Sequence, residues 1–283
     1  MSFTILDARS DGDADGVVIE AQVPYDAAAF RGHFPREPIL PAVALLDAIA
    51  RLADAHLDRC SEVLGVRGVR LRGTVAPDAR LAVKLAPVAD GVDFDVRTTD
   101  GPVARGRLLG ILDGSGAGDP SHGEPTAAEA DWRALDARTD AERERPDLPH
   151  EGPAYMLEHV ARREAGRGVA FTRVPSANAL VHADSAPSLV AIELAAQASA
   201  ACGPAEGDED GAAQAVAAGR GFVVNVRSAT LARPRIAAGE PYRVEVRAEA
   251  SAPPMRNFDA TVSARDGATL ARVRFATWVP VPE

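Results

Sequence analysis

His33 lies in a turn that runs directly into an apolar helix, and a histidine in that position could act as a base. Pro35, Pro38 and Pro41 forbid helix before residue 41, because each proline removes a backbone donor and biases its predecessor to extended geometry. A histidine with an unperturbed pKa of about 6.5 can accept a proton near neutral pH. A lone histidine beside such a turn is more often structural than catalytic, so the residues around it decide its role.

Two carboxylates interrupt helices that are otherwise apolar. Asp47 lies in the Ala/Leu/Ile-rich helix expected over residues 42–57, and Glu193 lies in a second such stretch, 187–198. Burying even a neutral polar group without a partner costs roughly 2–7 kcal/mol by transfer scales, so a carboxylate there needs compensation or a function. A backbone donor could satisfy Glu193, but we expect it to be functional.

One apolar helix with alternating strands makes each half of the chain an α+β unit. In the first half the patterns predict strands at residues 16–24, 63–74, 81–87, 92–98 and 102–112. In the second half they predict strands at residues 169–174, 221–231, 242–250, 258–264 and 269–280. Setting Pro41 on Pro187 aligns the two carboxylates, Asp47 with Glu193, so we interpret the chain as a divergent internal duplication.

The duplication has kept only one copy of the histidine. The same alignment puts Ala179 where the first half has His33, and His182 lies three positions further on. A displacement of three residues within a turn does not reproduce a side chain's position. Asp47 therefore lacks a histidine partner, and we expect a structural or vestigial role for it.

A polar segment separates the two halves. Residues 114–130 are rich in Gly, Pro, Ser and acidic residues and predict a flexible linker, which continues as a charged, exposed helix at 131–145. We therefore predict a first unit at residues 1–113, a linker at 114–145 and a second unit at 146–283.

Composition excludes several classes of function. The 283 residues suffice for two domains, and 46% hydrophobic and 25% charged residues are ordinary for a globular protein. The net charge of −10, with no basic cluster, argues against nucleic-acid binding. No run of eighteen strongly apolar residues occurs and the start lacks a signal-peptide pattern, so we expect a cytoplasmic protein without membrane contact. The two cysteines lack zinc-site spacing, and we expect no metal site.

Residues 32–41, Gly-His-Phe-Pro-Arg-Glu-Pro-Ile-Leu-Pro, match the G-H-F-P-x-x-P-(I/V)-(L/M)-P-G motif of the hotdog-fold 3-hydroxyacyl-acyl-carrier-protein dehydratases. The first half therefore resembles this family, although Ala42 stands where the family has glycine. In such enzymes the histidine lies fourteen residues before an acidic residue on the central helix, which is the spacing from His33 to Asp47. The resemblance implies an α+β double hotdog, with two antiparallel sheets each wrapping a central apolar helix.

The second half resembles the same family through other residues. Residues 148–160 are similar to its L-P-H-R-x-P-x-L-L-x-D-R-V segment, and Glu193 with Gln197 reproduces its E-x-x-x-Q helix. We expect the histidines of this segment, His150 and His159, to be strand or loop residues. Together the halves resemble a fusion of the two dehydratase-like partners of bacterial aryl polyene biosynthesis.

The resemblance implies one composite site. In hotdog dehydratases each site takes its histidine from one unit and its carboxylate from the other, which here pairs His33 with Glu193 as the catalytic residues. His33 would take the proton from C2 of the substrate. Desolvation would disfavour the charged form of Glu193, so that it holds a proton for, or orients, the departing hydroxyl. The mirror site would combine Asp47 with Ala179 and should be inactive.

Three further residues, Ala42, Gln197 and Arg36, are expected to bind substrate or support the site. The N–H of Ala42, at a helix N-terminus, is suited to stabilise the thioester oxygen, and Gln197 is expected to hydrogen-bond near the site. Arg36, like Arg31 and Arg51, either binds the phosphopantetheine phosphate or an acidic carrier protein, or is a solvated surface arginine. The chemistry requires neither metal nor organic cofactor.

We therefore expect a dehydratase that converts (3R)-3-hydroxyacyl thioesters of acyl carrier protein to trans-2-enoyl thioesters in fatty-acid, polyketide or polyene assembly. Further pairing into a homodimer of the two-unit chain is left open. One alternative is an acyl-thioester hydrolase, against which the retention of His33 argues. The other is a non-catalytic carrier-binding scaffold, which the loss of one site and the residues Ala42 and Arg51 favour.

Overall fold

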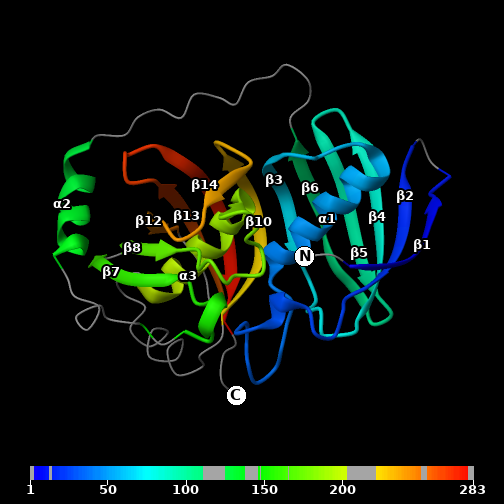
Figure 1. Cartoon of the computed structure of the whole chain (residues 1–283), viewed down its shortest axis with the longest axis horizontal. Coiled ribbons are helices and arrows are strands. Elements are labelled where there is room, and N and C mark those ends of the chain that lie inside the picture. The colour runs from blue at the N-terminus through cyan, green and yellow to red at the C-terminus, as the bar shows by residue number, and fades with distance from the viewer. Residues whose placement is uncertain are drawn as a thin grey trace.

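One continuous antiparallel sheet of 12 strands forms the framework of the protein (Figure 1). The computed structural model describes residues 3–12, 15–110, 125–137, 146, 148–164, 166–202, 221–249 and 254–279. The strands follow the order β1-β2-β4-β5-β6-β3-β10-β14-β13-β12-β8-β7. The first six belong to the first half and the last six to the second, in mirrored order. This arrangement confirms the predicted duplication at the level of topology.

The first half is a six-stranded sheet with one long helix. Its elements are β1 (Thr4–Ser10), β2 (Val17–Gln22), η1 (Ala28–Phe30), α1 (Ala42–Leu57), β3 (Val63–Leu71), β4 (Arg80–Val88), β5 (Gly91–Thr98) and β6 (Gly101–Gly110). Helix α1 has the predicted bounds, and it ends because Asp58 adopts a left-handed conformation with φ 51°. Strand β1 was not predicted. All seven of its residues are exposed, so it lacks the apolar alternation by which a strand is found.

The second half repeats this plan with a shorter helix. Its elements are η3 (Gly152–Ala154), β7 (Leu157–Glu164), β8 (Arg167–Arg173), β9 (Ser185–Pro187), η4 (Ser188–Val190), α3 (Ala191–Cys202), β10 (Phe222–Leu231), β11 (Arg235–Ala237), β12 (Pro241–Ala248), β13 (Met255–Ser263) and β14 (Thr269–Trp278). The helix predicted from residue 187 begins as α-helix only at Ala191, because residues 188–190 form a 3₁₀ turn. Strands β9 and β11 pair with each other outside the large sheet.

The two predicted sheets are joined edge to edge by β3 and β10. Val66 pairs with Ala229 in this seam, and Arg70 pairs with Asn225. The seam requires Gly65, since a Cβ there would lie 2.4 Å from the carbonyl oxygen of Ala229. Helix α1 lies across the strands of the first half and α3 across those of the second (Figure 1), and a single buried hydrophobic cluster includes residues of both helices. No helix among the described residues is both long and apolar enough to cross a membrane.

Helix α2 (Pro125–Asp136) corrects the predicted linker and its exposed helix. The helix starts within the stretch predicted to be flexible and ends well before residue 145. It is not fully exposed: Trp132 and Leu135, three residues apart and so on one face, are buried against Phe171 beside β7 and β8 (Figure 1). Residues 111–124 and 138–145 lie outside the described residues, so the three-part division of the chain stays a prediction.

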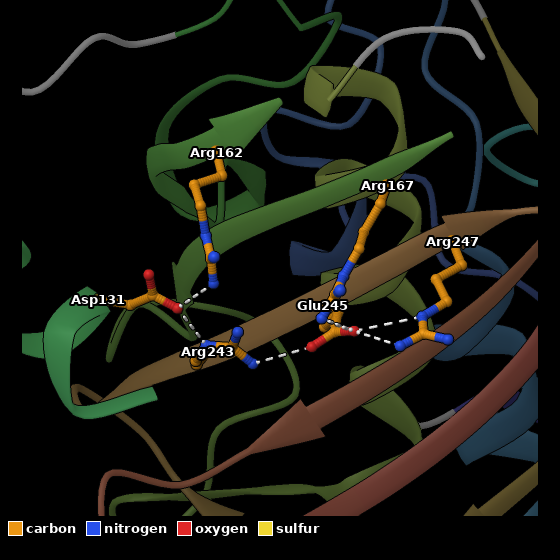
Figure 2. Close-up of polar contacts among 6 residues, drawn as sticks. All are labelled: Asp131, Arg162, Arg167, Arg243, Glu245 and Arg247. Atoms are coloured by element: carbon orange, nitrogen blue, oxygen red, sulfur yellow. Dashed lines mark hydrogen bonds and ion pairs between the residues drawn. The ribbon is translucent and has the colours of Figure 1, made fainter. Parts of the chain in front are cut away.

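A buried ion-pair network fixes α2 to the sheet, as Figure 2 shows. One oxygen of Asp131, Oδ2, accepts hydrogen bonds from Nη2 of Arg162 and Nε of Arg243, both at 2.9 Å. Arg243 also reaches Glu245 at 3.4 Å, and Glu245 in turn pairs with Arg167 at 2.8 Å. The side chains of Asp131 and Arg243 are only 9% and 10% exposed, so this pair is shielded from solvent.

We expect Asp131→Asn to lower the free energy of unfolding by about 3 kcal/mol, because it removes the nearest counter-charge of the buried Arg243 and leaves only the longer contact to Glu245. Urea denaturation measures this change. The matched control is Glu129→Gln on the same helix, where Glu129 pairs with Arg133 and both side chains are about 70% exposed. Such a surface pair contributes about 0.5 kcal/mol or less. Equal losses in the two variants would contradict a stabilising role for the network.

Candidate active site

The turn before α1 holds His33 in one tautomer. The residue is 8% exposed, and its Nδ1 lies 2.6 Å from the carbonyl oxygen of Ile39. Since a carbonyl only accepts, Nδ1 carries the hydrogen and Nε2 keeps its lone pair. His33 is therefore set up to accept a proton through Nε2.

The second half of the chain positions this turn. Gly32 has φ +78°, and a Cβ on it would lie 1.8 Å from the carbonyl oxygen of Glu151, so only glycine allows this approach. The backbone N–H of Glu151 donates to the Gly32 carbonyl at 2.8 Å. The ring of Phe34 stacks on Phe222 with centroids 5.4 Å apart, and it also lies beside the rings of His33, at 4.8 Å, and His150, at 5.5 Å. The glycine and phenylalanine of the motif thus join the two halves.

Glu193, in the first turn of α3, is fixed by hydrogen bonds to one of its oxygens. Its Oε1 accepts from Nε2 of Gln197 at 2.9 Å and lies 3.2 Å from Nε2 of His150. The amide of Gln197 is itself held, because it donates to the carbonyl of Ala154 at 2.8 Å and accepts from the N–H of Met156 at 2.9 Å. The predicted neighbours Glu193 and Gln197 do lie together, and all the polar groups of the Gln197 side chain are used.

His33 and Glu193 meet between the two halves, as predicted. One ring nitrogen of His33, one of His150 and one carboxylate oxygen of Glu193 all lie within 4.8 Å of one another. The catalytic roles of His33 and Glu193 stay a prediction. His150 lies in the loop before β7, as expected, and it is also a member of this cluster. The signal that could have found it is the match of residues 148–160 to the family's L-P-H segment.

Glu193 is ionised in the structure, whereas the sequence led us to expect that burial favours its protonated form. Burial lowers the pKa of His33, and the field of His150 adds to this, while Glu193 and the bond to Ile39 oppose it. His33 is therefore neutral near pH 7. Burial alone would raise the pKa of Glu193, but the hydrogen bond from His150, the charges of both histidines and the bond from Gln197 lower it to about 2. Desolvation thus acts on Glu193 in the predicted direction, but these partners, which the sequence did not reveal, outweigh it.

A narrow cavity of about 20 Å³, room for one or two water molecules, reaches His33 and Glu193. Pro41 and Val43 line it, and Ala42 lies between them as the first residue of α1. The N–H of the first residue of a helix has no acceptor within that helix. The N–H of Ala42, predicted to bind the thioester oxygen, therefore lies beside the cavity without an acceptor in α1.

The structure separates the three arginines considered as phosphate ligands. Arg31 is exposed and lines the same cavity as His33. Arg36 is exposed on the turn and is not among the residues that line the described cavities. Arg51 pairs with Asp47 through Nε at 2.9 Å. Arg31 is thus better placed than Arg36 to contact a molecule entering the site.

The predicted mirror pair of Asp47 and Ala179 does not line one cavity, because Ala179 lines the cavity of His33 and Glu193. Asp47 and Arg51 line another cavity, of about 280 Å³, together with Pro187 of β9 and Leu189 of η4. No histidine lines this cavity among the residues that the structure describes. In the alignment Arg51 takes the place of Gln197, so a charged pair replaces a carboxylate held by an amide.

We expect Asp47→Asn to keep turnover within about twofold of wild type, because none of the described residues that line its cavity is a histidine and Asp47 serves the fold. The side chain is 8% exposed and bonded to Arg51, so the variant should lose about 1–3 kcal/mol of unfolding free energy. Turnover and urea denaturation of the same sample measure both quantities. A large loss of turnover without a loss of stability would assign chemistry to Asp47.

Two family profiles match the chain, one on each half. A profile of ApeI-like proteins, described as ApeI dehydratase, matches residues 9–107, and one of ApeP-like proteins, described as ApeP dehydratase, matches residues 145–282. The predicted resemblance to a fusion of two dehydratase-like proteins is thereby confirmed.

The chain is also similar to curated proteins that are described as dehydratases. The 3-hydroxyacyl-[acyl-carrier-protein] dehydratase FabZ of Anaeromyxobacter dehalogenans is 33% identical over 66 residues, which cover 20% of this chain and 42% of the relative. The chain thus spans less than half of that enzyme. The FabZ of Latilactobacillus sakei is 32% identical over 98 residues, which cover 31% of this chain and 70% of the relative.

Solved structures match the whole fold at low sequence identity. The dehydratase domain of the polyketide PpsC from Mycobacterium tuberculosis has a TM-score of 0.64 and 15% identity, covering 98% of both chains. A pyran synthase domain from module nine of the sorangicin pathway has a TM-score of 0.62 and 18% identity, covering 99% of this chain and 98% of the domain. At these identities the matches show the fold, and they confirm the double hotdog.

Proposed function

Because the chain belongs to the hotdog-fold 3-hydroxyacyl-acyl-carrier-protein dehydratase family, we propose that it removes water from a (3R)-3-hydroxyacyl thioester of acyl carrier protein to give the trans-2-enoyl thioester. The observation that carries this proposal is the approach of His33 and Glu193, from opposite halves, to within 4.8 Å. One base and one carboxylate are the groups that elimination across two adjacent carbons requires.

The reaction breaks two bonds of the substrate and forms one double bond. Nε2 of His33 takes the proton from C2, for which its lowered pKa and its fixed Nδ1–H tautomer suit it. The hydroxyl on C3 leaves with the electron pair of the C–O bond and becomes water by taking up a proton. Glu193 lines the cavity beside His33 and is the group that contacts this hydroxyl.

The thioester oxygen gains negative charge while C2 is deprotonated. Helix α1 begins at Ala42, beside two residues that line the cavity, so its free N–H groups and the positive end of its dipole can stabilise that charge. Placing the thioester carbonyl at this helix end also places C2 towards His33, which precedes the helix.

The carrier arm is expected to enter past Arg31. A phosphopantetheine phosphate is an anion, and Arg31 is the one positively charged side chain among the described residues that line the cavity. We therefore prefer Arg31 to Arg36 as the phosphate ligand. Acyl carrier protein as the partner, a cytoplasmic location, polyene substrates and pairing into a homodimer stay predictions.

The direct test is incubation of the purified chain with 3-hydroxyacyl-acyl carrier protein and mass analysis of the product. Loss of 18 Da from the acyl group, as expected for one water, supports the proposal. Free hydroxy acid would identify a thioester hydrolase instead. No product with any chain length, despite binding of the carrier protein, would favour a non-catalytic scaffold.

A further inference from the structure

His150 contacts the carboxylate of Glu193 but is not among the residues that line the cavity. Its Nε2 is 3.2 Å from Oε1 of Glu193, and the two side chains are 11% and 12% exposed. Glu193 lines the cavity, whereas His150 does not. His150 therefore acts on the reaction through the groups it contacts, above all the carboxylate of Glu193, and not through the substrate.

Both donors to Glu193 reach the same oxygen. Nε2 of His150 and Nε2 of Gln197 are directed at Oε1, which leaves Oε2 for a substrate hydroxyl. An oxygen that accepts two N–H donors favours the ionised carboxylate. The other charged or titratable groups around the cavity are His33 and Arg31, and no second carboxylate lines it among the described residues. No second negative charge in the described cavity wall therefore favours the protonated form of Glu193, and the two donors to Oε1 oppose the effect of burial.

The backbone holds His150 and His33 together. The two residues form an isolated antiparallel bridge between the halves, and their ring centroids are 5.2 Å apart. The ring of Phe34 contacts both imidazoles, with centroids at 4.8 Å and 5.5 Å. His33 and His150 thus belong to one contact between the two halves.

We propose that His150 is a positioning residue that binds Oε1 of Glu193 and holds it as an anion, so that Oε2 orients the C3 hydroxyl and His33 returns the C2 proton to it. This inference rests on the proposed dehydratase function and specifies how that function is carried out. The low pKa of Glu193 supports it, because a group ionised near pH 7 is poorly suited to donate a proton.

The proton balance of this route needs no further acid. The C2–H bond breaks and its proton goes to Nε2 of His33, while the electron pair forms the C2=C3 double bond. The C3–O bond breaks with its electron pair on oxygen, and that oxygen takes the proton from Nε2. Water leaves, His33 is neutral again, and Glu193 and His150 end in the state in which they began.

The test compares the pH dependence of kcat/KM for wild type, His150→Leu and His150→Gln. Leucine removes the donor to Oε1, so we expect kcat to fall by the order of 10²-fold and the acidic limb of the profile to move to higher pH. Glutamine keeps an N–H donor and should recover most of the loss. If His150→Leu is unchanged, or gains activity at low pH, Glu193 acts as an acid and the proposal is wrong.

A second measurement does not depend on turnover or on the folding of the His150 variants. The infrared difference spectrum between wild type and Glu193→Gln reports whether Glu193 carries a proton. We expect no band of a protonated carboxyl group near pH 6 in the wild type. Such a band would overturn the proposed state of Glu193 even in an active dehydratase. If wild-type turnover fails while the band is absent, the failure belongs to the proposed function alone.

Discussion

His33→Ala should lower kcat/KM for dehydration by about 10²–10⁴-fold, the range that general base catalysis contributes. Nε2 of His33 carries a lone pair that can accept a proton, because Nδ1 donates its hydrogen to the carbonyl of Ile39. His33 lines the same cavity as Glu193. The variant removes the group that takes the C2 proton and, in the route proposed here, also the group that returns it. Formation of enoyl product, followed by mass, measures the loss.

The matched control is His182→Ala, in the turn of the second half near the position that aligns with His33. His182 is exposed and lines neither described cavity, so its loss should leave turnover unchanged. Thermal unfolding of both variants separates a lost base from a disturbed turn. A His33→Ala protein that unfolds like wild type and still dehydrates at a similar rate would exclude His33 as the base.

Local sequence patterns predicted the elements whose apolar residues follow a clear helical or strand pattern. Helix α1 was found at its observed bounds because Pro41 sets its start and its residues are apolar almost all round. Strand β1 was missed because every one of its side chains is exposed, so only its pairing with β2 makes it a strand. Helix α2 was misplaced because its burial depends on Phe171 of the second half, which a local reading of residues 114–145 does not include.

Sequence motifs predicted which residues form the candidate site, but they did not predict the charge state of Glu193. The repeat at Pro41 and Pro187 was enough to align the carboxylates and to see that only one histidine was retained. The contact of His150 with Glu193 joins residues 43 positions apart and depends on where the turn before β7 lies. Without that contact, burial was the only effect that the sequence revealed for Glu193, and burial alone gives the wrong sign for its pKa.

Glu193→Gln is the second substitution expected to have a large effect, a loss of about 10²-fold or more in kcat. Glutamine keeps the size of the side chain but replaces one acceptor oxygen by an amide nitrogen. The variant can no longer present a carboxylate to the C3 hydroxyl, and it sets an amide against the N–H groups of His150 and Gln197. Turnover should fall with little change in KM if Glu193 acts mainly in the transition state.

Asp47→Asn is the control for this substitution, because it makes the same chemical change at the aligned position of the other helix. We expect it to retain turnover where Glu193→Gln loses it. Similar losses in both variants would mean that removing a buried carboxylate from either helix disturbs the fold, and the asymmetry between the two sites would then have no catalytic meaning.

The pH dependence of stability tests the charge of Glu193 independently of catalysis. Its pKa is about 2 in the folded protein against an ordinary value of 4.5, so the unfolded chain binds the proton more readily. The ionised carboxylate therefore stabilises the fold fully above about pH 4.5, and this contribution is lost as the pH falls towards 2. Glu193→Gln should lack this dependence, so the difference in unfolding free energy between wild type and variant should shrink over that range. A difference that stays constant would mean that Glu193 titrates alike in the folded and unfolded chains, and that His150 and Gln197 do not stabilise its charge.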